Sequence, residues 1–182
     1  MSPALLSKRL KQLQQAGIVT VSRKANGSVD YHLSESGEEL RPLIMGLGNW
    51  AQRWMESRLS LRNLDPSLLM WDMRRSLNLQ MLPERRCTIQ FLYSEVPPSQ
   101  KSWWLVVDGG SVDLCTFDPG HELDLVVKSS LRSMTAIWMG LTTIKTETES
   151  GQIEIKGDPS LAVSMQHWLG LSAFAHLPRR VQ

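Results

Sequence analysis

The chain has few cysteines, almost no excess of charge and no long hydrophobic run. Its 182 residues include two cysteines and carry a formal net charge of +2. Cys87 and Cys115 lie in apolar, strand-like runs, which favours reduced core thiols over the alternatives of a disulfide or a metal site. No apolar run reaches the roughly 18 to 20 residues that cross a bilayer, and the N-terminus lacks a signal-peptide pattern. We therefore expect a cytoplasmic protein with no membrane partner.

Signatures of catalysis and metal binding are also missing from the sequence. It contains no HExxH, CxxC, GxSxG or GxGxxG pattern. The histidines have no ligand-like spacing: His32, His121, His167 and His176. The acids that cluster in sequence alternate as solvent-facing residues do: Asp113, Asp118, Glu122 and Asp124. We expect no enzyme, no catalytic residue, no metal and no cofactor.

The composition is that of a globular protein with two small units. Hydrophobic residues make up 42% and charged residues 21%. Residues 1–62 hold nine Lys or Arg against five acids, whereas residues 63–182 hold eleven against thirteen. The asymmetry is typical of a basic nucleic-acid-binding domain followed by a nearly neutral domain, although ordinary solvated surfaces also carry such an excess of charge. The predicted domains are residues 1–62 and residues 63–182.

The first element is predicted to be a helix over residues 3–16. Ser2-Pro3 is a helix-start signal and Gly17 is the matching stop. One face carries an apolar stripe of Leu6, Leu10 and Leu13. The opposite face carries small, basic and amide side chains, as a helix laid in a major groove needs: Ala4, Lys8, Lys11 and Gln15. The alternative is a solvated amphipathic helix.

Two short strands, over residues 18–24 and 29–34, are predicted to follow as a hairpin with Asn26-Gly27 in its turn. A two-residue Asn-Gly loop would pair Val21 with His32. A three-residue loop of Asn26, Gly27 and Ser28, which makes better chemical sense, would pair Val21 with Leu33 and would place Gly27 in a left-handed bulge. It would also pair Lys24 with Asp30. The apolar residues then share one face: Val19, Val21, Val29, Tyr31 and Leu33. A helix followed by a basic hairpin is the order of recognition helix and wing in a winged-helix domain.

The N-terminal third resembles the HxlR-type winged-helix regulators. The segments that carry the likeness are SPALLSKRLKQL at residues 2–13, Gly17-Ile18-Val19 and YHLSESGEEL at residues 31–40. The resemblance implies a bacterial transcriptional regulator that binds double-stranded DNA. The expected DNA-binding residues on the helix and wing are Ser2, Ala4, Lys8, Lys11, Gln15, Arg23, Lys24 and Asn26.

The likeness extends through a helix to Trp54, with Ser34 as its cap. In the family this helix forms the dimer, so the resemblance implies a homodimer joined by Leu40, Leu43, Leu47, Trp50 and Trp54. Alternatively, the same stripe packs only within its own chain. The family normally places two helices ahead of the recognition helix, where this sequence has Met1. We therefore expect the Leu6, Leu10 and Leu13 stripe to lack its scaffold, and the chain to bind DNA more weakly than an extended form.

The rest of the sequence predicts an α+β domain. Asp65-Pro66 opens a helix over residues 66–81, and strands are expected at 87–93, 103–107, 112–117 and 122–127. Gly- and Pro-rich breakers between them favour a meandering, mainly antiparallel sheet. A helix over 130–146, a strand over 152–156 and a helix over 159–169 complete the order.

This order resembles the sterol-carrier-protein family over about residues 66–170. The closing segment GQIEIKGDPSL at 151–161, the ELDL strand at 122–125, and Trp138 and Gly140 carry the likeness. In that family the α+β domain encloses an apolar tunnel. The resemblance therefore implies an effector-binding or dimer-supporting module for an apolar ligand, without catalysis.

Seven tryptophans are many for this length and predict an aromatic interior or pocket. The expected pocket residues are Trp103, Trp104, Met134, Ile137, Trp138 and Met165. Core packing is the alternative for each, and strand alternation allows only one of Trp103 and Trp104 to face the core side of the sheet. The leading hypothesis is a DNA-binding regulator with a possible apolar small-molecule effector. Its rival is a lipid or hydrophobe carrier whose N-terminal fragment serves only for dimerisation.

Overall fold

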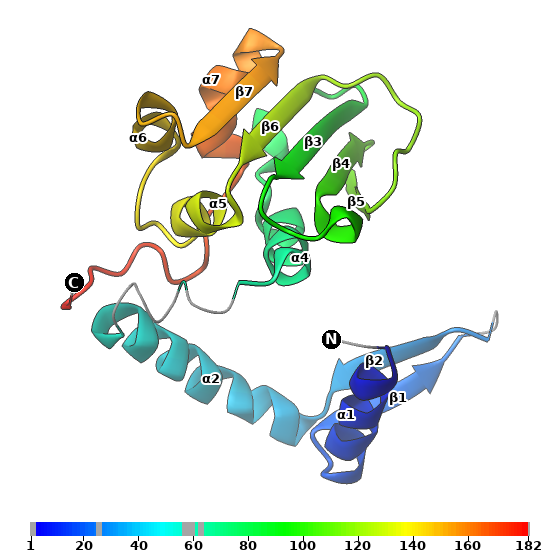
Figure 1. Ribbon diagram of the computed structural model, residues 1–182. Coiled ribbons are helices and arrows are strands. Elements are labelled where there is room, and N and C mark those ends of the chain that lie inside the picture. Colours follow the sequence, from blue (N-terminus) through cyan, green and yellow to red (C-terminus); the bar gives the residue numbers. More distant parts are fainter. Residues whose placement is uncertain (1–2, 25–26, 56–60, 62–63, 182) are drawn as a thin grey trace. The chain divides into compact units, whose positions relative to one another are not determined.

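The computed structural model describes residues 3–24, 27–55, 61 and 64–181 (Figure 1). The chain divides into two compact units, Met1–Ala51 and Gln52–Gln182. Both α-helices and β-strands contribute, which confirms the predicted α+β class. No helix among the described residues is long and apolar enough to cross a membrane.

The first unit contains a helix, a hairpin and most of a second helix. Their bounds are α1 Pro3–Gln15, β1 Val19–Arg23, β2 Val29–Leu33 and α2 Glu35–Trp54. The α1 helix ends where Gly17 adopts a positive φ of 73°, as its stop signal predicts.

The hairpin register differs from the prediction by two residues. Val21 pairs with Tyr31 rather than with Leu33. The cause is the position of the turn, because Lys24 N donates to Ser28 O at 2.9 Å and Gly27 N donates back to Lys24 O at 2.9 Å. Lys24 and Ser28 therefore flank the turn, and Gly27 adopts a φ of 81°. A shift of two leaves each side chain on its predicted face.

Ser34 caps α2 as predicted. Its Oγ accepts a hydrogen bond from Gly37 N at 3.1 Å and donates to Gly17 O at 2.5 Å. A Cβ at Gly37 would lie 2.3 Å from Ile18 O, so only glycine allows this close approach of α2 to the hairpin. The cap therefore ties α1, the hairpin and α2 together.

The second unit is one five-stranded sheet with helices. Its helices are α4 Pro66–Ser76, α5 Leu131–Trp138, α6 Ile144–Glu149 and α7 Pro159–Trp168, with short 3₁₀ turns η1 Leu79–Met81 and η2 Pro98–Gln100. Its strands are β3 Cys87–Tyr93, β4 Ser102–Asp108, β5 Ser111–Cys115, β6 Leu125–Ser129 and β7 Ile153–Gly157.

The strand order β5-β4-β3-β6-β7 confirms a mainly antiparallel sheet but corrects the simple meander. The β6 strand returns to pair with β3, and this pair is parallel. The segment between β5 and β6 therefore leads from the edge strand β5 past β4 and β3 instead of closing a hairpin. Figure 1 shows it as the long loop outside the sheet.

The core of the second unit lies between one face of the sheet and helices α4, α5 and α7. Trp103, Leu105 and Val107 of β4 point into this core, together with Met134 and Ile137 of α5. Trp104 is also buried but does not belong to the core cluster, because adjacent strand residues point to opposite faces. This confirms the prediction that only one of Trp103 and Trp104 faces the core side of the sheet.

Two predicted helices are shorter in the structure than their apolar patterns indicated. The helix expected over 66–81 ends at Ser76, because Asn78 N donates to Trp168 O at 2.9 Å instead of continuing the helix. The helix expected over 130–146 is split into α5 and α6. Gly140, at a φ of 71°, ends α5, and Leu141 N closes its C-terminus on Ala136 O at 2.8 Å.

The C-terminal tail, residues 170–181, contacts the last turn of α2 within the second unit. Arg180 N donates to Arg53 O at 2.8 Å. Gln52 is buried there, and its Nε2 donates to Met139 O at 3.3 Å. The end of α2 is thus bonded both to the tail and to the residue that follows α5.

Candidate functional site

The α1 helix carries four of the predicted DNA-binding residues. Ala4, Lys8, Lys11 and Gln15 are all exposed. Neither Lys8 nor Lys11 forms an ion pair with any residue that the structure describes, so both ammonium groups are available to phosphates. Ser2 lies outside the described residues.

The wing carries the other predicted DNA contacts. Arg23 and Lys24 are exposed at the end of the hairpin, beside the turn. Lys24 Nζ lies 2.9 Å from Asp30 Oδ2, so this carboxylate offsets part of the wing's positive charge. Asn26 lies outside the described residues. The pairing of Lys24 with Asp30 was predicted as a strand pair and occurs instead as a side-chain ion pair.

The first unit buries little of its apolar surface. Leu6 is 49% exposed and Leu13 is 42% exposed on α1. On α2, Leu43, Leu47 and Trp50 are each more than half exposed, and Leu40 and Trp54 are exposed as well. The five α2 residues repeat at alternating steps of three and four, which is the spacing of a coiled-coil seam.

The predicted pocket residues lie mainly in the packed core. Met134, Ile137 and Met165 are completely buried within the core cluster, and Trp103 joins them. The Trp103 indole N–H donates to Gln100 O at 2.7 Å. Of the six, Trp138 alone lines any described cavity, a small one of about 130 Å³ beside α4. Their role in ligand binding stays a prediction.

A larger apolar groove lies between α6, β7 and α7. Its volume is about 620 Å³, within the range of small-molecule sites. Its walls include Ile144, Ile155 and Val163. Gln166 also lines it, and its Oε1 accepts a hydrogen bond from Ile144 N at 2.9 Å. Ile144 also belongs to the core cluster, so this wall of the groove adjoins the core. The sequence did not predict this groove, because its apolar pattern indicated one helix over residues 130–146 where the structure has α5 and α6.

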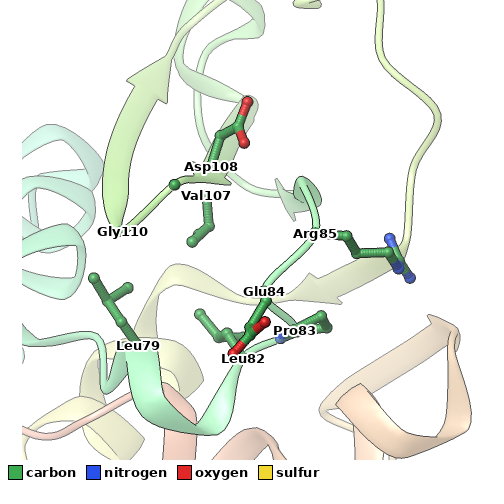
Figure 2. A pocket seen from close by; sticks show the side chains of 9 residues that line it. Leu79, Leu82, Pro83, Glu84, Arg85, Val107, Asp108 and Gly110 are labelled. Atoms are coloured by element: carbon green, nitrogen blue, oxygen red, sulfur yellow. The ribbon is translucent and has the colours of Figure 1, made fainter.

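A smaller pocket of about 280 Å³ lies beside the β4–β5 turn (Figure 2). Leu79, Leu82 and Val107 form its apolar floor, while the Arg85 side chain runs away from that floor. Asp108, at its edge, is bound by Arg86 at 2.7 Å. Because this carboxylate is held in an ion pair, it is poorly placed for acid–base work.

Asp124 was expected to face solvent, and this expectation is wrong. Its side chain is 14% exposed, and it accepts from Arg85 Nη1 at 2.5 Å and from Thr88 N at 2.8 Å. These bonds attach the start of β6 to β3. Bonding to Asp124 also raises the pKa of the Arg85 guanidinium. Among the described residues, no group of three or more His, Cys, Asp or Glu side chains is placed to hold a metal ion.

Comparison with known proteins finds a family model that matches the N-terminal third of the chain. Residues 1–59 match the model of the HxlR-like helix-turn-helix family. This match confirms the predicted resemblance for α1, the hairpin and α2. No curated protein sequence matches the chain.

Solved structures match the remainder of the chain. A double mutant of the sec-alkyl sulfatase PisA1 aligns with a TM-score of 0.50 at 15% identity, covering 62% of this chain and 17% of the sulfatase. Sterol Carrier Protein 2 Like 2 from Aedes aegypti aligns with a TM-score of 0.40 at 19% identity, covering 55% of this chain and 92% of its own. The UbiJ-SCP2 ubiquinone synthesis protein aligns with a TM-score of 0.41 at 18% identity, covering 57% and 84%.

The sulfatase likeness shows a shared fold alone, and this chain spans only 17% of the length of that protein. The comparisons therefore show a match to the HxlR-like helix-turn-helix family model at residues 1–59. The structure shows that an α+β unit follows it.

Proposed function

We propose that this protein is a DNA-binding transcriptional regulator whose C-terminal unit binds an apolar small-molecule effector. The observation that carries the proposal is the exposed basic face of α1 next to a basic hairpin, where neither Lys8 nor Lys11 forms an ion pair with a described residue. The HxlR-like match over residues 1–59 supports the same assignment. In this arrangement α1 enters the major groove, and Arg23 and Lys24 of the wing contact the adjacent backbone.

A salt titration tests the DNA-binding part. The full chain and a Lys8→Ala/Lys11→Ala variant are titrated with labelled duplex from the protein's own promoter, between about 50 and 200 mM salt. Each phosphate contact contributes about 0.9 to the slope of log affinity against log salt, so the variant should flatten the slope by about 1.8 per protomer. Lys101→Ala/Arg132→Ala is the matched control, because it removes the same charge from exposed positions of the second unit. Equal slopes for all three proteins would contradict the proposal.

The homodimer is part of the proposal. Exposed apolar residues at coiled-coil spacing on α2 provide a self-complementary surface, and a second copy of the chain would cover it. Two copies would then present two α1 helices to a near-palindromic site.

The effector site proposed here is the groove between α6, β7 and α7. Its apolar walls and its volume of about 620 Å³ suit one small apolar molecule. Val163 is 85% exposed on this groove, so Val163→Asp should weaken binding of a fluorescent long-chain fatty-acid analogue without disturbing the core. Leu68→Asp is the control, because it places the same charge at another exposed apolar position. Equal loss of binding in both variants would exclude the groove.

The same groove favours a second candidate function, that of a lipid or hydrophobe carrier whose first unit serves only for dimerisation. The two functions differ in one measurement. A carrier would bind the fatty-acid analogue but would show no salt-dependent binding of duplex DNA at low salt.

A further inference from the structure

The β7 strand forms one edge of the five-stranded sheet, and β6 is its only strand partner among the described residues. Figure 1 shows β7 on the outside of the sheet, beside α6 and α7. No side chain in the described part of the chain forms a hydrogen bond with the backbone of β7. Unpaired N–H and C=O groups along such an edge can pair with another extended chain.

The opposite edge strand, β5, is partly closed by a side chain. Arg74 of α4 donates from its Nε to the carbonyl oxygen of Val112 at 2.7 Å. This bond occupies a backbone acceptor that a further strand beside β5 would need. Of the two edges of the sheet, β7 is therefore the one that is open to a further strand.

The side chains of β7 alternate between an apolar face and a charged face. Ile153 is buried in the core cluster and Ile155 lines the apolar groove, so both lie on the side of the helices. Glu154 and Lys156 lie on the other face, with 49% and 75% of their side chains exposed. Lys156 Nζ lies 2.5 Å from Glu154 Oε1 on the same strand. The outer face of this edge thus carries one acid and one base, two positions apart.

The order Glu154-Ile155-Lys156 is self-complementary in one antiparallel register. If Ile155 pairs with its own copy across a two-fold axis, Glu154 of each chain lies opposite Lys156 of the other chain. A shift of two residues would place Glu154 opposite Glu154, or Lys156 opposite Lys156. A shift of one residue would bring the charged side chains to the apolar face. A second copy of the chain therefore matches both faces of β7 in a single register.

We propose that β7 is a self-association edge, at which a second copy pairs antiparallel about Ile155 and joins the two five-stranded sheets. Directly opposite side chains have Cβ atoms about 4.5 to 5.5 Å apart, closer than the roughly 6 to 7 Å between alternate residues of one strand. Glu154 and Lys156 therefore exchange their partner on the same strand for a nearer one on the other chain. The contact uses no residue of α2 and does not depend on DNA or on an effector.

This association is weaker than the proposed pairing through α2. A short strand buries little surface, which places the contact among transient interfaces with a Kd on the order of 100 µM or higher. At micromolar concentration the α2 seam alone is expected to hold two chains together. The β7 contact is therefore measured at high protein concentration, with the seam removed.

Sedimentation equilibrium of the full chain in the Leu43→Glu/Leu47→Glu background tests the proposal. The average mass should rise from one chain toward two between about 10 µM and about 1 mM. Glu154→Lys and Lys156→Glu should each weaken this association about tenfold, because each places like charges opposite one another at two symmetric positions. The two substitutions combined in one chain should restore it.

A mixture of the two single variants separates pairing between chains from a local effect on β7. The Glu154→Lys chain carries two bases on this edge and the Lys156→Glu chain carries two acids, so the equimolar mixture should associate although neither variant does so alone. A disturbed ion pair within one strand could not be rescued in this way. Glu122→Lys and Lys101→Glu make the same charge changes at exposed positions outside β6 and β7, and mixing them should add no association beyond that of each alone.

Two outcomes would overturn the proposal. One is a chain that stays monomeric up to about 1 mM, which would leave the β7 edge to an extended segment of another protein. The other is a mixture of Glu154→Lys and Lys156→Glu that associates no better than the control mixture. None of these readouts uses DNA or an apolar ligand, so failure here leaves the proposed regulator function untouched.

Discussion

Gln52 Nε2 donates a hydrogen bond to the carbonyl oxygen of Met139, at 3.3 Å, from a side chain that is 7% exposed. Gln52 lies in the last turn of α2, and Met139 is the residue that caps the end of α5. Together with the bond from Arg180 N to Arg53 O, this contact fixes the end of α2 to the second unit.

Arg180→Pro tests this attachment, because proline lacks the N–H that donates to Arg53 O at 2.8 Å. Amide hydrogen exchange in the last turn of α2 should become roughly 2- to 12-fold faster, the range expected from the loss of one backbone hydrogen bond. Arg180→Ala removes the side chain but keeps the N–H, so its exchange should match that of the unaltered protein. Equal acceleration in both variants would assign the effect to the arginine side chain.

Asp30→Asn should strengthen DNA binding. Asp30 holds Lys24 at 2.9 Å, so its removal frees a wing ammonium for a phosphate. The slope of log affinity against log salt should steepen by about 0.9 per protomer. Glu122→Gln, which changes the net charge equally at an exposed site in the second unit, is the control. If both variants gain equally, the effect is one of overall charge and not of the wing.

Leu43→Glu/Leu47→Glu should convert the protein to a monomer in analytical ultracentrifugation. Leu43 is 66% exposed and Leu47 is 61% exposed in the single chain, and a dimer interface would recover about 1.5 to 3 kcal/mol for each leucine that it buries. Leu68→Glu/Trp71→Glu alters two exposed apolar residues of α4 and should leave the dimer intact. A monomeric unaltered protein at micromolar concentration would contradict the proposed seam.

Stability should fall as the pH rises from about 9 to about 11, in part through Cys87. Burial is the largest cause that raises the pKa of this thiol from its ordinary value of 9.0 to about 11. The thiolate therefore forms more readily in the unfolded chain, so the contribution is present below pH 9 and is lost as the pH approaches 11. Urea unfolding at several pH values measures the slope, and Cys87→Ala should show a shallower one. Identical slopes would exclude the thiol as the source.

Gly140→Ala should destabilise the protein more than Gly151→Ala. Both glycines have a positive φ, 71° and 73°, which costs roughly 1 to 2 kcal/mol for alanine. A Cβ at Gly140 would also lie 2.9 Å from the Ala175 Cβ, whereas one at Gly151 would meet nothing within 4 Å. Thermal unfolding should therefore separate the two variants. Adding Ala175→Gly should recover only part of the difference, because the carbonyl oxygen of residue 175, 3.1 Å from the new Cβ, remains. No recovery on adding Ala175→Gly would show that the cost lies in the backbone alone.

Local signals in the sequence predicted most elements, because they depend on neighbouring residues. Asp65 caps α4 and Asp158 caps α7, each followed by the proline that marks a first turn. Gly17 ends α1 and Ser34 caps α2, and the HxlR-like match agrees with that order. The face of each hairpin residue was also predictable, since alternation along a strand survives the shift of two in register.

Contacts distant in sequence decided the remaining features. The hydrogen bond from Asn78 N to Trp168 O directs the chain away from the helix axis after α4, and Ala175 leaves room only for a glycine at position 140. The two helices that the apolar patterns predicted are therefore shorter in the structure. The split of α5 from α6 opened the groove beside β7, which the pattern of the sequence did not indicate.

The sequence by itself determined the order of helices and strands, the basic face of α1 and the apolar seam of α2, because periodicity and caps act within a few residues. Only the tertiary structure decided that β6 returns beside β3, which placed Asp124 against Arg85. The reason is physical. Pairing between strands and burial of side chains depend on which distant segments meet, and no local pattern contains that information.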